Sequence, residues 1–314
     1  MLVIRGQHNL REHHRGCVAT IGNFDGVHLG HQAVLAALKV RARQQGLPSL
    51  LITFEPQPLE YFRPEQAPAR LTRPREKLEL LREAGIDRVL LLRFDQDLAM
   101  MEAEDFIREI LVDGLGVKHL YVGDDFRFGR NRVGDFDLLQ AQGREQGFTV
   151  ENLETISDKC GRISSTRIRQ ALAVGDMETA ACCLGRGYRM SGKVEHGNKK
   201  GRTIGFPTMN VGVARLHSPV HGVFAVFVEG LEDRPLAGVA SIGNRPIVDG
   251  DDRFVLEVHV FDFAREVYGA QVSVHFIERL REERNYETFE ALREQILLDA
   301  EQARVACENH LKKN

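Results

Sequence analysis

The feature of this sequence that most constrains its fold is a change in the spacing of apolar residues near residue 185. Up to that point, short apolar runs suited to strands alternate with stretches of helical periodicity. Beyond it, strand-like runs follow one another without helices between them. Parallel strands need crossover helices whereas antiparallel strands need only turns, so the two patterns belong to different cores. Because 314 residues are also long for one core, we predict two domains, 1–185 and 186–314.

The first domain is predicted to be a Rossmann-like α/β domain with a parallel sheet. Pro74 and Gly85 stand where one helix begins and ends, since proline suits a first turn and glycine a C-terminal cap. Ligands of such sheets bind beyond the carboxyl ends of the strands. The predicted strands are 18–24, 49–54, 89–94, 119–122 and 149–153. One predicted helix follows the first strand and continues to residue 43, and the others cover 74–84, 104–112 and 135–146.

The second domain has the pattern of a small antiparallel barrel or sandwich, and of these we predict the β-barrel. Glycines separate its β-rich runs, and one α-helix closes the chain from about residue 286. The predicted strands include 223–228, 237–242, 254–263 and 272–277, and the apolar residues at helical spacing are Phe289, Leu292, Ile296, Leu297 and Ala300.

Charge and composition narrow the classes of function. The net charge of −3 gives no general attraction for nucleic acid or anionic membranes, so a polyanion must meet a local site. Apolar runs such as 89–92 are far too short to cross a bilayer, and the first residues lack the apolar core of a signal peptide. We therefore expect a cytoplasmic protein. The five cysteines show no metal-binding spacing, and we assign them no function.

The stretch GNFDGVHLGH, residues 22–31, lies between a predicted strand and a predicted helix. Gly22 and Gly26 allow a tight turn and a close approach of the backbone to a ligand. The amides at a helix start attract phosphate, and His28 and His31 can donate hydrogen bonds to its oxygens. Two histidines at this spacing are common by chance, so the pair alone favours incidental turn residues. No Walker A motif occurs, which excludes a P-loop protein.

Three more stretches extend this candidate site. Residues 163–169, ISSTRIR, open an apolar helix, and capping alone would account for their hydroxyl groups. Residues 123–130, GDDFRFGR, place two phenylalanines among charged residues, which is rare in a solvated loop. Residues 53–58, TFEPQP, follow the second predicted strand.

The H-x-G-H pattern resembles the signature of the nucleotidyltransferases, which attack the α-phosphate of a nucleotide and expel pyrophosphate. The four motifs in this order resemble the FMN adenylyltransferase half of the prokaryotic bifunctional riboflavin kinase/FAD synthetases. This resemblance implies that the first domain makes FAD and pyrophosphate from FMN and ATP, with His28 and His31 stabilising the developing charge. It implies an ATP site formed by Gly22, Asn23, Phe24, Asp25, Gly30, Ser164, Ser165, Thr166 and Arg167. It implies a flavin site formed by Asn23, Phe54, Pro56, Pro58, Asp124, Phe126 and Phe128.

A second constellation lies in the predicted barrel. The glycines and cationic side chains of 192–202 could wrap the phosphates of a nucleotide, or could equally form a solvated turn. Thr208 and Asn210 are two apart in an extended segment and project to the same side, and oxygen ligands of this kind suit Mg²⁺. In LEVHV, residues 256–260, strict alternation places Glu257 and His259 on the face opposite the apolar residues.

The patterns G-R-x-x-G-F-P-T-x-N and L-E-V-H resemble the riboflavin kinase domain of the same family. The resemblance implies that Glu257 is the general base, taking a proton from the ribityl hydroxyl of riboflavin as it attacks the γ-phosphate of ATP to give FMN and ADP. It implies metal binding by Thr208 and Asn210, and flavin binding by Arg279, Arg281 and Phe289. It implies an ATP site of Gly192, Val194, His196, Gly197, Lys199, Gly201, Arg202, Phe206 and Pro207.

Two positions depart from that family's usual residues: Phe224 stands where tyrosine is frequent, and Ile247 where threonine is usual. The predicted protein is thus a bifunctional flavin cofactor enzyme that uses ATP and Mg²⁺, without nucleic-acid or membrane partners. One alternative is a nucleotidyltransferase with another acceptor, such as a phosphosugar or phosphopantetheine, fused to an unrelated barrel. The other is a flavin-binding regulator or RNA-contacting barrel without catalysis, which the two histidines, Glu257 and the acidic net charge disfavour.

Overall fold

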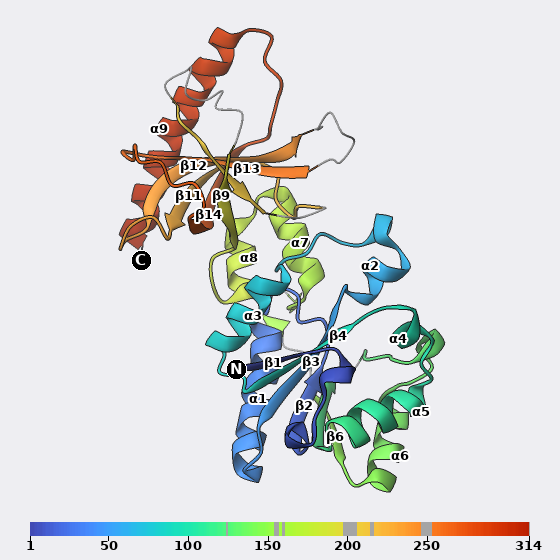
Figure 1. Cartoon of the computed structure of the whole chain (residues 1–314). Helices are drawn as coiled ribbons and strands as arrows, with labels where there is room; N and C mark the ends of the chain where they lie inside the picture. The colour runs from blue at the N-terminus through green and yellow to red at the C-terminus, as the bar shows by residue number, and fades with distance from the viewer. Residues whose placement is uncertain are drawn as a thin grey trace. The chain divides into compact units, whose positions relative to one another are not determined.

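The computed structural model describes residues 1–123, 125–153, 157–158, 161–196, 206–213, 217–245 and 253–313. The chain forms two compact units: unit 1 comprises Met1–Pro68 and Pro74–Ser164, and unit 2 comprises Ala69–Arg73 and Ser165–Asn314 (Figure 1). Unit 2 therefore includes a five-residue segment from the first half of the sequence. The domain boundary after residue 185 stays a prediction.

Unit 1 contains the predicted parallel sheet, with the strand order β1-β4-β3-β2-β5-β6. Every pairing between neighbouring strands is parallel, so all six carboxyl ends lie at one edge. The first strand was not expected from the sequence, and the other five match predicted strands within a few residues. The strands are β1 (Leu2–Arg5), β2 (Cys17–Ile21), β3 (Ser49–Glu55), β4 (Arg88–Arg93), β5 (Val117–Gly123) and β6 (Thr149–Leu153).

Helices connect these strands, as a parallel sheet requires. The helix expected over 104–112 begins as α5 (Ala103–Asp105) but continues as a π-helical segment, η4 (Phe106–Gly114). The other helices are α1 (Leu29–Gln45), α2 (Pro58–Phe62), α3 (Pro74–Glu83), α4 (Gln96–Met100) and α6 (Phe136–Gln146). A short hairpin, β7 (Ser157–Asp158) and β8 (Gly161–Arg162), lies outside the sheet, as do single turns at Gln7–Asn9, Glu12–His14, Pro64–Gln66 and Arg130–Arg132.

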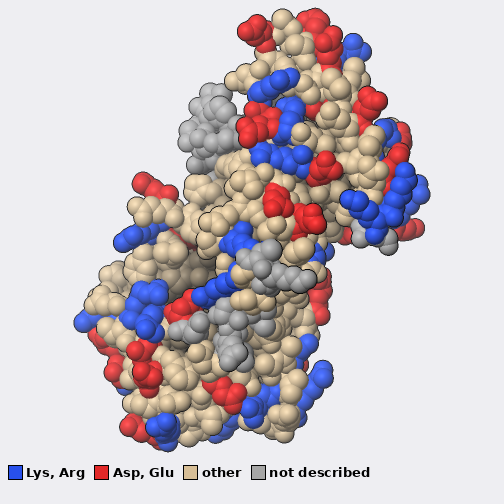
Figure 2. Space-filling model, turned by 180° about the vertical axis from the view of Figure 1, so that it is seen from behind, with Lys and Arg blue, Asp and Glu red and all other residues tan. Residues whose placement is uncertain are grey.

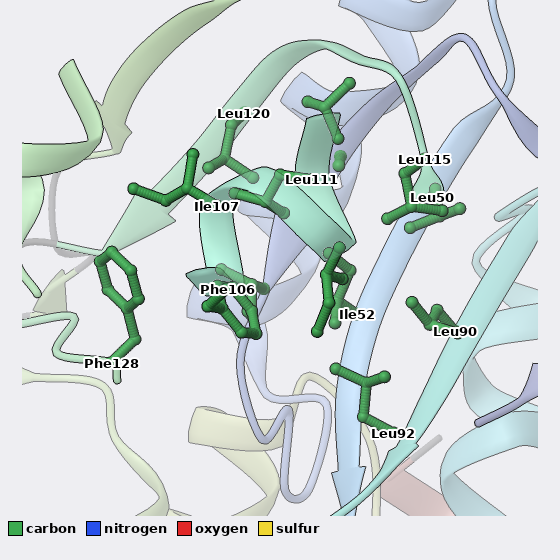
Figure 3. Close-up of a cluster of buried hydrophobic side chains, with 14 of the residues drawn as sticks. Leu50, Ile52, Leu90, Leu92, Phe106, Ile107, Leu111, Leu115, Leu120 and Phe128 are labelled. Atoms are coloured by element: carbon green, nitrogen blue, oxygen red, sulfur yellow. The ribbon is translucent and has the colours of Figure 1, made fainter. Parts of the chain in front are cut away.

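The two faces of the sheet carry separate hydrophobic clusters, because successive side chains of a strand point to opposite faces. On β3, Leu50 and Ile52 join one cluster and Leu51 joins the other. Figure 3 shows the first cluster, in which residues of η4 lie over β3 and β4. The second cluster packs α1 and α3 against the opposite face. The sheet is therefore covered on both sides, as predicted.

Unit 2 contains a closed antiparallel barrel with the strand order β10-β13-β12-β11-β14-β9, which confirms the predicted barrel with a terminal helix. The strand expected over 254–263 is shorter than predicted, because the chain turns at Asp262, whose φ is 56°. The strands are β9 (Arg189–Glu195), β10 (Met209–Gly212), β11 (Gly222–Glu229), β12 (Leu236–Arg245), β13 (Arg253–Val260) and β14 (Gln271–Arg281). The helices are α7 (Ser165–Val174), α8 (Met177–Leu184) and α9 (Phe289–Lys313).

Each strand of the barrel has one side facing inward, and α9 packs on the outer side of β11, β12 and β14. Phe224 is fully buried, with its ring 5.2 Å from that of Phe276 in an edge-to-face arrangement. A tyrosine hydroxyl here would need a buried partner, so phenylalanine suits this site. On the outer face, Ala303 and Cys307 of α9 cover Ala225 of β11. Ile247, the other departure from the family pattern, lies outside the described residues.

An ion pair between Arg281 and Asp299 joins α9 to the last strand of the barrel. Arg281 Nε donates to Asp299 Oδ1 at 2.9 Å and Arg281 Nη2 donates to Oδ2 at 2.7 Å. Asp299 is buried and also accepts from Gln295 Nε2 at 2.9 Å. Arg281, which sequence resemblance assigns to flavin binding, thus has its guanidinium engaged by α9.

Replacing Asp299 with alanine should lower the free energy of unfolding by about 2–4 kcal/mol, because it leaves the arginine charge half-buried without its partner. The matched control is Arg304→Met, which removes the exposed ion pair between α9 and Asp262 and should cost far less. Urea unfolding followed by circular dichroism measures both. Equal losses for the two variants would contradict the anchoring role of Arg281.

Candidate functional site

The loop between β2 and α1 places His28 at the N-terminal cap of α1. The backbone amide of His31 donates to His28 Nδ1 at 3.3 Å, so the histidine ring does the capping that serine or aspartate usually does. Since Nδ1 accepts this hydrogen bond, the neutral ring carries its hydrogen on Nε2. The ring is thus prepared to donate from Nε2 at the positive end of a helix.

The two histidine rings lie stacked at the carboxyl edge of the sheet. Their centroids are 3.6 Å apart, and the Phe24 ring stacks on His31 at 4.6 Å. Gly30 makes this arrangement possible, because a Cβ there would stand 3.1 Å from Cε1 of His28. The glycine of the H-x-G-H pattern is therefore explained by the space that the His28 ring occupies.

The backbone of the same loop is strained. Phe24 and Val27 have positive φ angles of 48° and 41°, and Gly26 between them has 83°. A β-branched residue rarely adopts such a conformation, and strain of this kind concentrates at functional sites. Gln32 holds the loop by donating from Nε2 to the Val27 carbonyl at 2.9 Å. Because Gln32 belongs to α1, this hydrogen bond joins the helix to the loop.

His31 is held in its neutral form. Its pKa lies well below the ordinary value mainly because burial disfavours the charged ring, and the ionisable groups of His28 and Lys77 lower it further. Its Nδ1 is shielded from solvent and has no hydrogen-bond partner among the residues that the structure describes. A neutral imidazole can still form a hydrogen bond with a ligand through this nitrogen.

Aromatic side chains gather at the ends of β3 and β4. Phe54, which resemblance assigns to flavin binding, lies 5.8 Å from Phe94 between ring centroids, and both Tyr61 and Phe62 lie 5.5 Å from Phe94. Phe62 is 59% exposed. Sequence reasoning missed Tyr61, Phe62 and Phe94, although an aromatic pair directly after a proline-rich turn was a usable signal. Pro56 and Pro58 lie in that turn, with Pro58 opening α2.

The loop after β5 contributes the remaining aromatic residues. Phe128 is buried in the core of unit 1, and the Phe126 ring stacks on it at 5.4 Å. Phe128 therefore supports the loop, while Phe126 is only partly buried. Asp125 is paired with Arg162 at 3.4 Å. Asp124 lies outside the described residues.

The ISSTRIR motif spans the division between the units: Ser164 ends unit 1, and α7 of unit 2 opens with Ser165, Thr166 and Arg167. Asn23 contributes its backbone carbonyl, which accepts from Thr53 Oγ1 at 3.4 Å. Asp25 is buried, and Gly22 packs closely under the Phe24 ring.

In unit 2, the alternation predicted for residues 256–260 is confirmed. Leu256 and Val258 are buried inside the barrel and Glu257 is half-buried on the other face. Asn210 of β10 and Ser241 of β12 are the register partners of Glu257, so the three side chains share one face. Thr208 is exposed just before β10. The structure thus brings a carboxylate and an amide onto one face of the barrel.

Seven of the nine residues assigned to the kinase ATP site fall into three groups. Val194 is buried, and Gly192 allows β9 to approach β10, since a Cβ there would lie 2.6 Å from the Gly212 carbonyl. His196 is exposed and stacks on Tyr268 with ring centroids 3.9 Å apart. Gly197, Lys199, Gly201 and Arg202 lie outside the described residues.

His259 links the remaining assigned residues. Its Nδ1 lies 2.8 Å from the Pro207 carbonyl, its ring lies 4.6 Å from that of Phe206, and burial lowers its pKa. Of the residues assigned to the flavin, Arg279 is paired with Glu282 at 3.0 Å, and Phe289 is exposed at the start of α9.

Metal-binding clusters of three or more His, Cys, Asp or Glu side chains are absent from the described residues. Cys17, Cys183 and Cys307 are buried, and burial raises the pKa of Cys17 to about 12, so its thiol is unreactive at neutral pH. Cys160 lies outside the described residues.

Two family models match the chain: FAD synthetase over residues 10–167 and riboflavin kinase over residues 184–307. The bifunctional riboflavin kinase/FMN adenylyltransferase of Pseudomonas fluorescens is 51% identical over 304 residues, 97% of each chain. That of Escherichia coli K12 is 50% identical over 305 residues, again 97% of each chain.

A solved structure from Streptococcus pneumoniae, titled a macrolide-efflux protein, aligns with 97% of this chain and 99% of its own. Its TM-score is 0.79 and its sequence identity is 30%. Within the described part of this chain, the helices are too short or too polar to cross a membrane.

Gly30→Ala should slow the adenylyl transfer that the motifs imply by about tenfold, because the new methyl group displaces the His28 ring by a few tenths of an ångström. Stability should not fall, since alanine favours a helix by about 1 kcal/mol over glycine. Gly46→Ala, at the left-handed C-terminal cap of the same helix, is the control and should show the reverse: lower stability with normal turnover. Normal turnover in Gly30→Ala would contradict the placement of His28.

Proposed function

Because the chain belongs to the bifunctional riboflavin kinase/FMN adenylyltransferase family, we propose a division of its two reactions between named residues of its two halves. The protein phosphorylates riboflavin to FMN and adenylylates FMN to FAD. The FAD synthetase part is N-terminal and the riboflavin kinase part is C-terminal. ATP is a substrate of both reactions. We place the domain boundary near residue 185, as the sequence predicts.

In the adenylyl transfer that we assign to the N-terminal FAD synthetase part, a phosphate oxygen of FMN attacks the α-phosphorus of ATP. The bond from that phosphorus to the oxygen bridging to the β-phosphate breaks, and pyrophosphate leaves. His28 donates a hydrogen bond from Nε2 to the α-phosphate oxygen on which charge develops. His31, as a neutral ring, stacks on His28 and holds it in place. The observation that carries this assignment is the capping of α1 by His28 Nδ1, which aims the ring's other nitrogen away from the helix.

The remaining contacts follow the same division. The flavin ring packs against the exposed aromatic side chains beside Phe54, and flat aromatic surfaces suit a flat ring system. This favours FMN over a phosphosugar or phosphopantetheine as the acceptor. Ser164, Ser165, Thr166 and Arg167 hold the β- and γ-phosphates by hydroxyl and guanidinium groups.

In the kinase reaction, Glu257 takes the proton from the ribityl hydroxyl while that oxygen attacks the γ-phosphorus of ATP. The bond to the β-phosphate oxygen breaks and ADP leaves. The shared face of Glu257 and Asn210 supports this assignment, because it sets a base beside a polar amide. His196 and the glycine-rich segment after it bind the nucleotide.

Thr208 and Asn210 would hold Mg²⁺ in the kinase site. Their side-chain oxygens are hard donors, and Mg²⁺ usually takes only one or two protein ligands beside phosphate oxygens and waters. The described residues fit this pattern, since Asn210 lies in register with a carboxylate. When bound, the ion would neutralise charge on the phosphates.

The non-catalytic alternative is disfavoured. On the face shown in Figure 2, basic and acidic side chains are interspersed, unlike the basic face of an RNA-binding barrel. The cytoplasmic location expected from the sequence stays part of the proposal.

Replacing His28 or His31 with alanine should reduce FAD formation by roughly a hundredfold or more, as loss of one preorganised donor does. FMN formation from riboflavin should persist in both variants, because the kinase residues lie in the other half. Chromatography of FMN and FAD from riboflavin and ATP gives both rates in one assay. Equal loss of the two activities would point to misfolding or to a shared site.

Glu257→Gln should lower kcat for FMN formation by roughly 10²–10⁴-fold while ATP still binds, because only the proton transfer is impaired. Thr208→Ala or Asn210→Ala should instead raise the Mg²⁺ concentration needed for half-maximal turnover. Steady-state kinetics with Mg²⁺ titrated at fixed riboflavin separate the two effects.

Glu229→Gln, which alters an acidic residue at the end of β11, is the matched control for the loss of a carboxylate from the barrel. It should leave unchanged both kcat for FMN formation and the Mg²⁺ concentration needed for half-maximal turnover. Near-normal FMN turnover in folded Glu257→Gln would exclude Glu257 as the general base.

A further inference from the structure

A buried lysine of α3 lies close enough to His31 to influence its pKa. Lys77 is 2% exposed and lies on the inward face of α3, with Leu80 and Leu81. Lysine is rarely buried to this degree, because its charge loses hydration that the interior must replace. Chains that keep such a residue use its charge in an ion-pair network or at a functional site.

The ammonium group of Lys77 is linked to the loop between β2 and α1 through the hydroxyl group of Thr53. Its Nζ donates to Thr53 Oγ1 at 3.4 Å, and the same hydroxyl donates to the Asn23 carbonyl at 3.4 Å. Thr53 is fully buried on β3. The three residues thus connect α3, the sheet and the strained loop that carries Asn23.

Lys77 also acts on His31 through space. Among the described residues, the ionisable groups that act on His31 are His28 of its own loop and Lys77 of α3, and both lower its pKa. Inside a core the effective dielectric constant is low, so a fixed charge has more influence than it would in water. The same positive charge that disfavours a protonated His31 favours an anionic phosphate nearby.

We propose that Lys77 is a positioning residue for adenylyl transfer: its ammonium group orients Thr53 and the Asn23 carbonyl, and provides a fixed positive charge beside His31. The proposal rests on the assignment of His28 and His31 to this reaction. It requires no contact between Lys77 and the substrates. The competing explanation is that Lys77 only stabilises the packing of α3.

Lys77→Met tests this choice, because methionine keeps the length of the buried stem and removes the charge. Removing a buried charge that has partners lowers stability, so the melting temperature of each variant is measured and only folded protein is compared. Arg75→Met, which removes the same charge from the exposed side of α3, is the matched control. Both are made in the full-length chain.

For Lys77→Met we expect kcat for FAD formation to fall by about 10–100-fold, with FMN formation unchanged. We also expect the His31 ring to titrate at higher pH, because removal of a positive neighbour raises its pKa. NMR of ¹³C-labelled histidine rings measures this midpoint, with His31 assigned through His31→Gln. Arg75→Met should change neither quantity.

Normal FAD formation in folded Lys77→Met, or an unshifted His31 titration, would overturn the proposal. If His31→Gln itself made FAD at the normal rate, the assignment of the site and the role of Lys77 would both fail. Loss of FAD in His31→Gln with retention in Lys77→Met would refute the role of Lys77 alone. If Lys77→Met did not fold, Lys77→Gln repeats the test, and failure of both to fold would show a purely structural lysine.

Discussion

The hydrogen bond from the His31 amide to His28 Nδ1 is the contact on which the adenylyl-transfer site depends. It caps α1, selects the protonated nitrogen of His28 and stacks the two imidazole rings. The rest of the loop is shaped around it: Gly30 leaves room for the ring, and Phe24 and Val27 adopt costly backbone angles. Packing of α1 and α3 against the sheet stabilises this arrangement, so folding energy holds the histidines before any ligand arrives.

The sheets of the two units place their polar side chains in different ways. A parallel sheet gathers all its strand ends at one edge, and a loop there can collect residues from far apart in the sequence. A closed barrel has no free edge, so its polar side chains must share the outer face with α9. The Arg281–Asp299 ion pair attaches that helix, while Glu257 and Asn210 occupy a different part of the outer face. Both sites therefore use polar groups that lie outside the hydrophobic clusters of their unit.

Apolar periodicity predicted the main strands and helices closely, because burial determines which positions must be apolar. The strand at 149–153 has the bounds predicted for it. The strands β1 and β9 were missed, since their pairing depends on distant partners rather than on local pattern. Lys77 was missed for a related reason: in a charged helical stretch, the local pattern did not show that this lysine faces inward. The motif residues were identified through resemblance, and their contacts came only from the fold.

The most direct test of the account is to follow two radioactive labels of ATP through the full-length protein with riboflavin as the only flavin supplied. If the kinase and adenylyltransferase act in sequence, label from the γ-phosphate enters FMN and is carried into FAD. Label from the α-phosphate then enters FAD and never FMN. Label from the α-phosphate in FMN, or FAD formed without label from the γ-phosphate, would contradict the account.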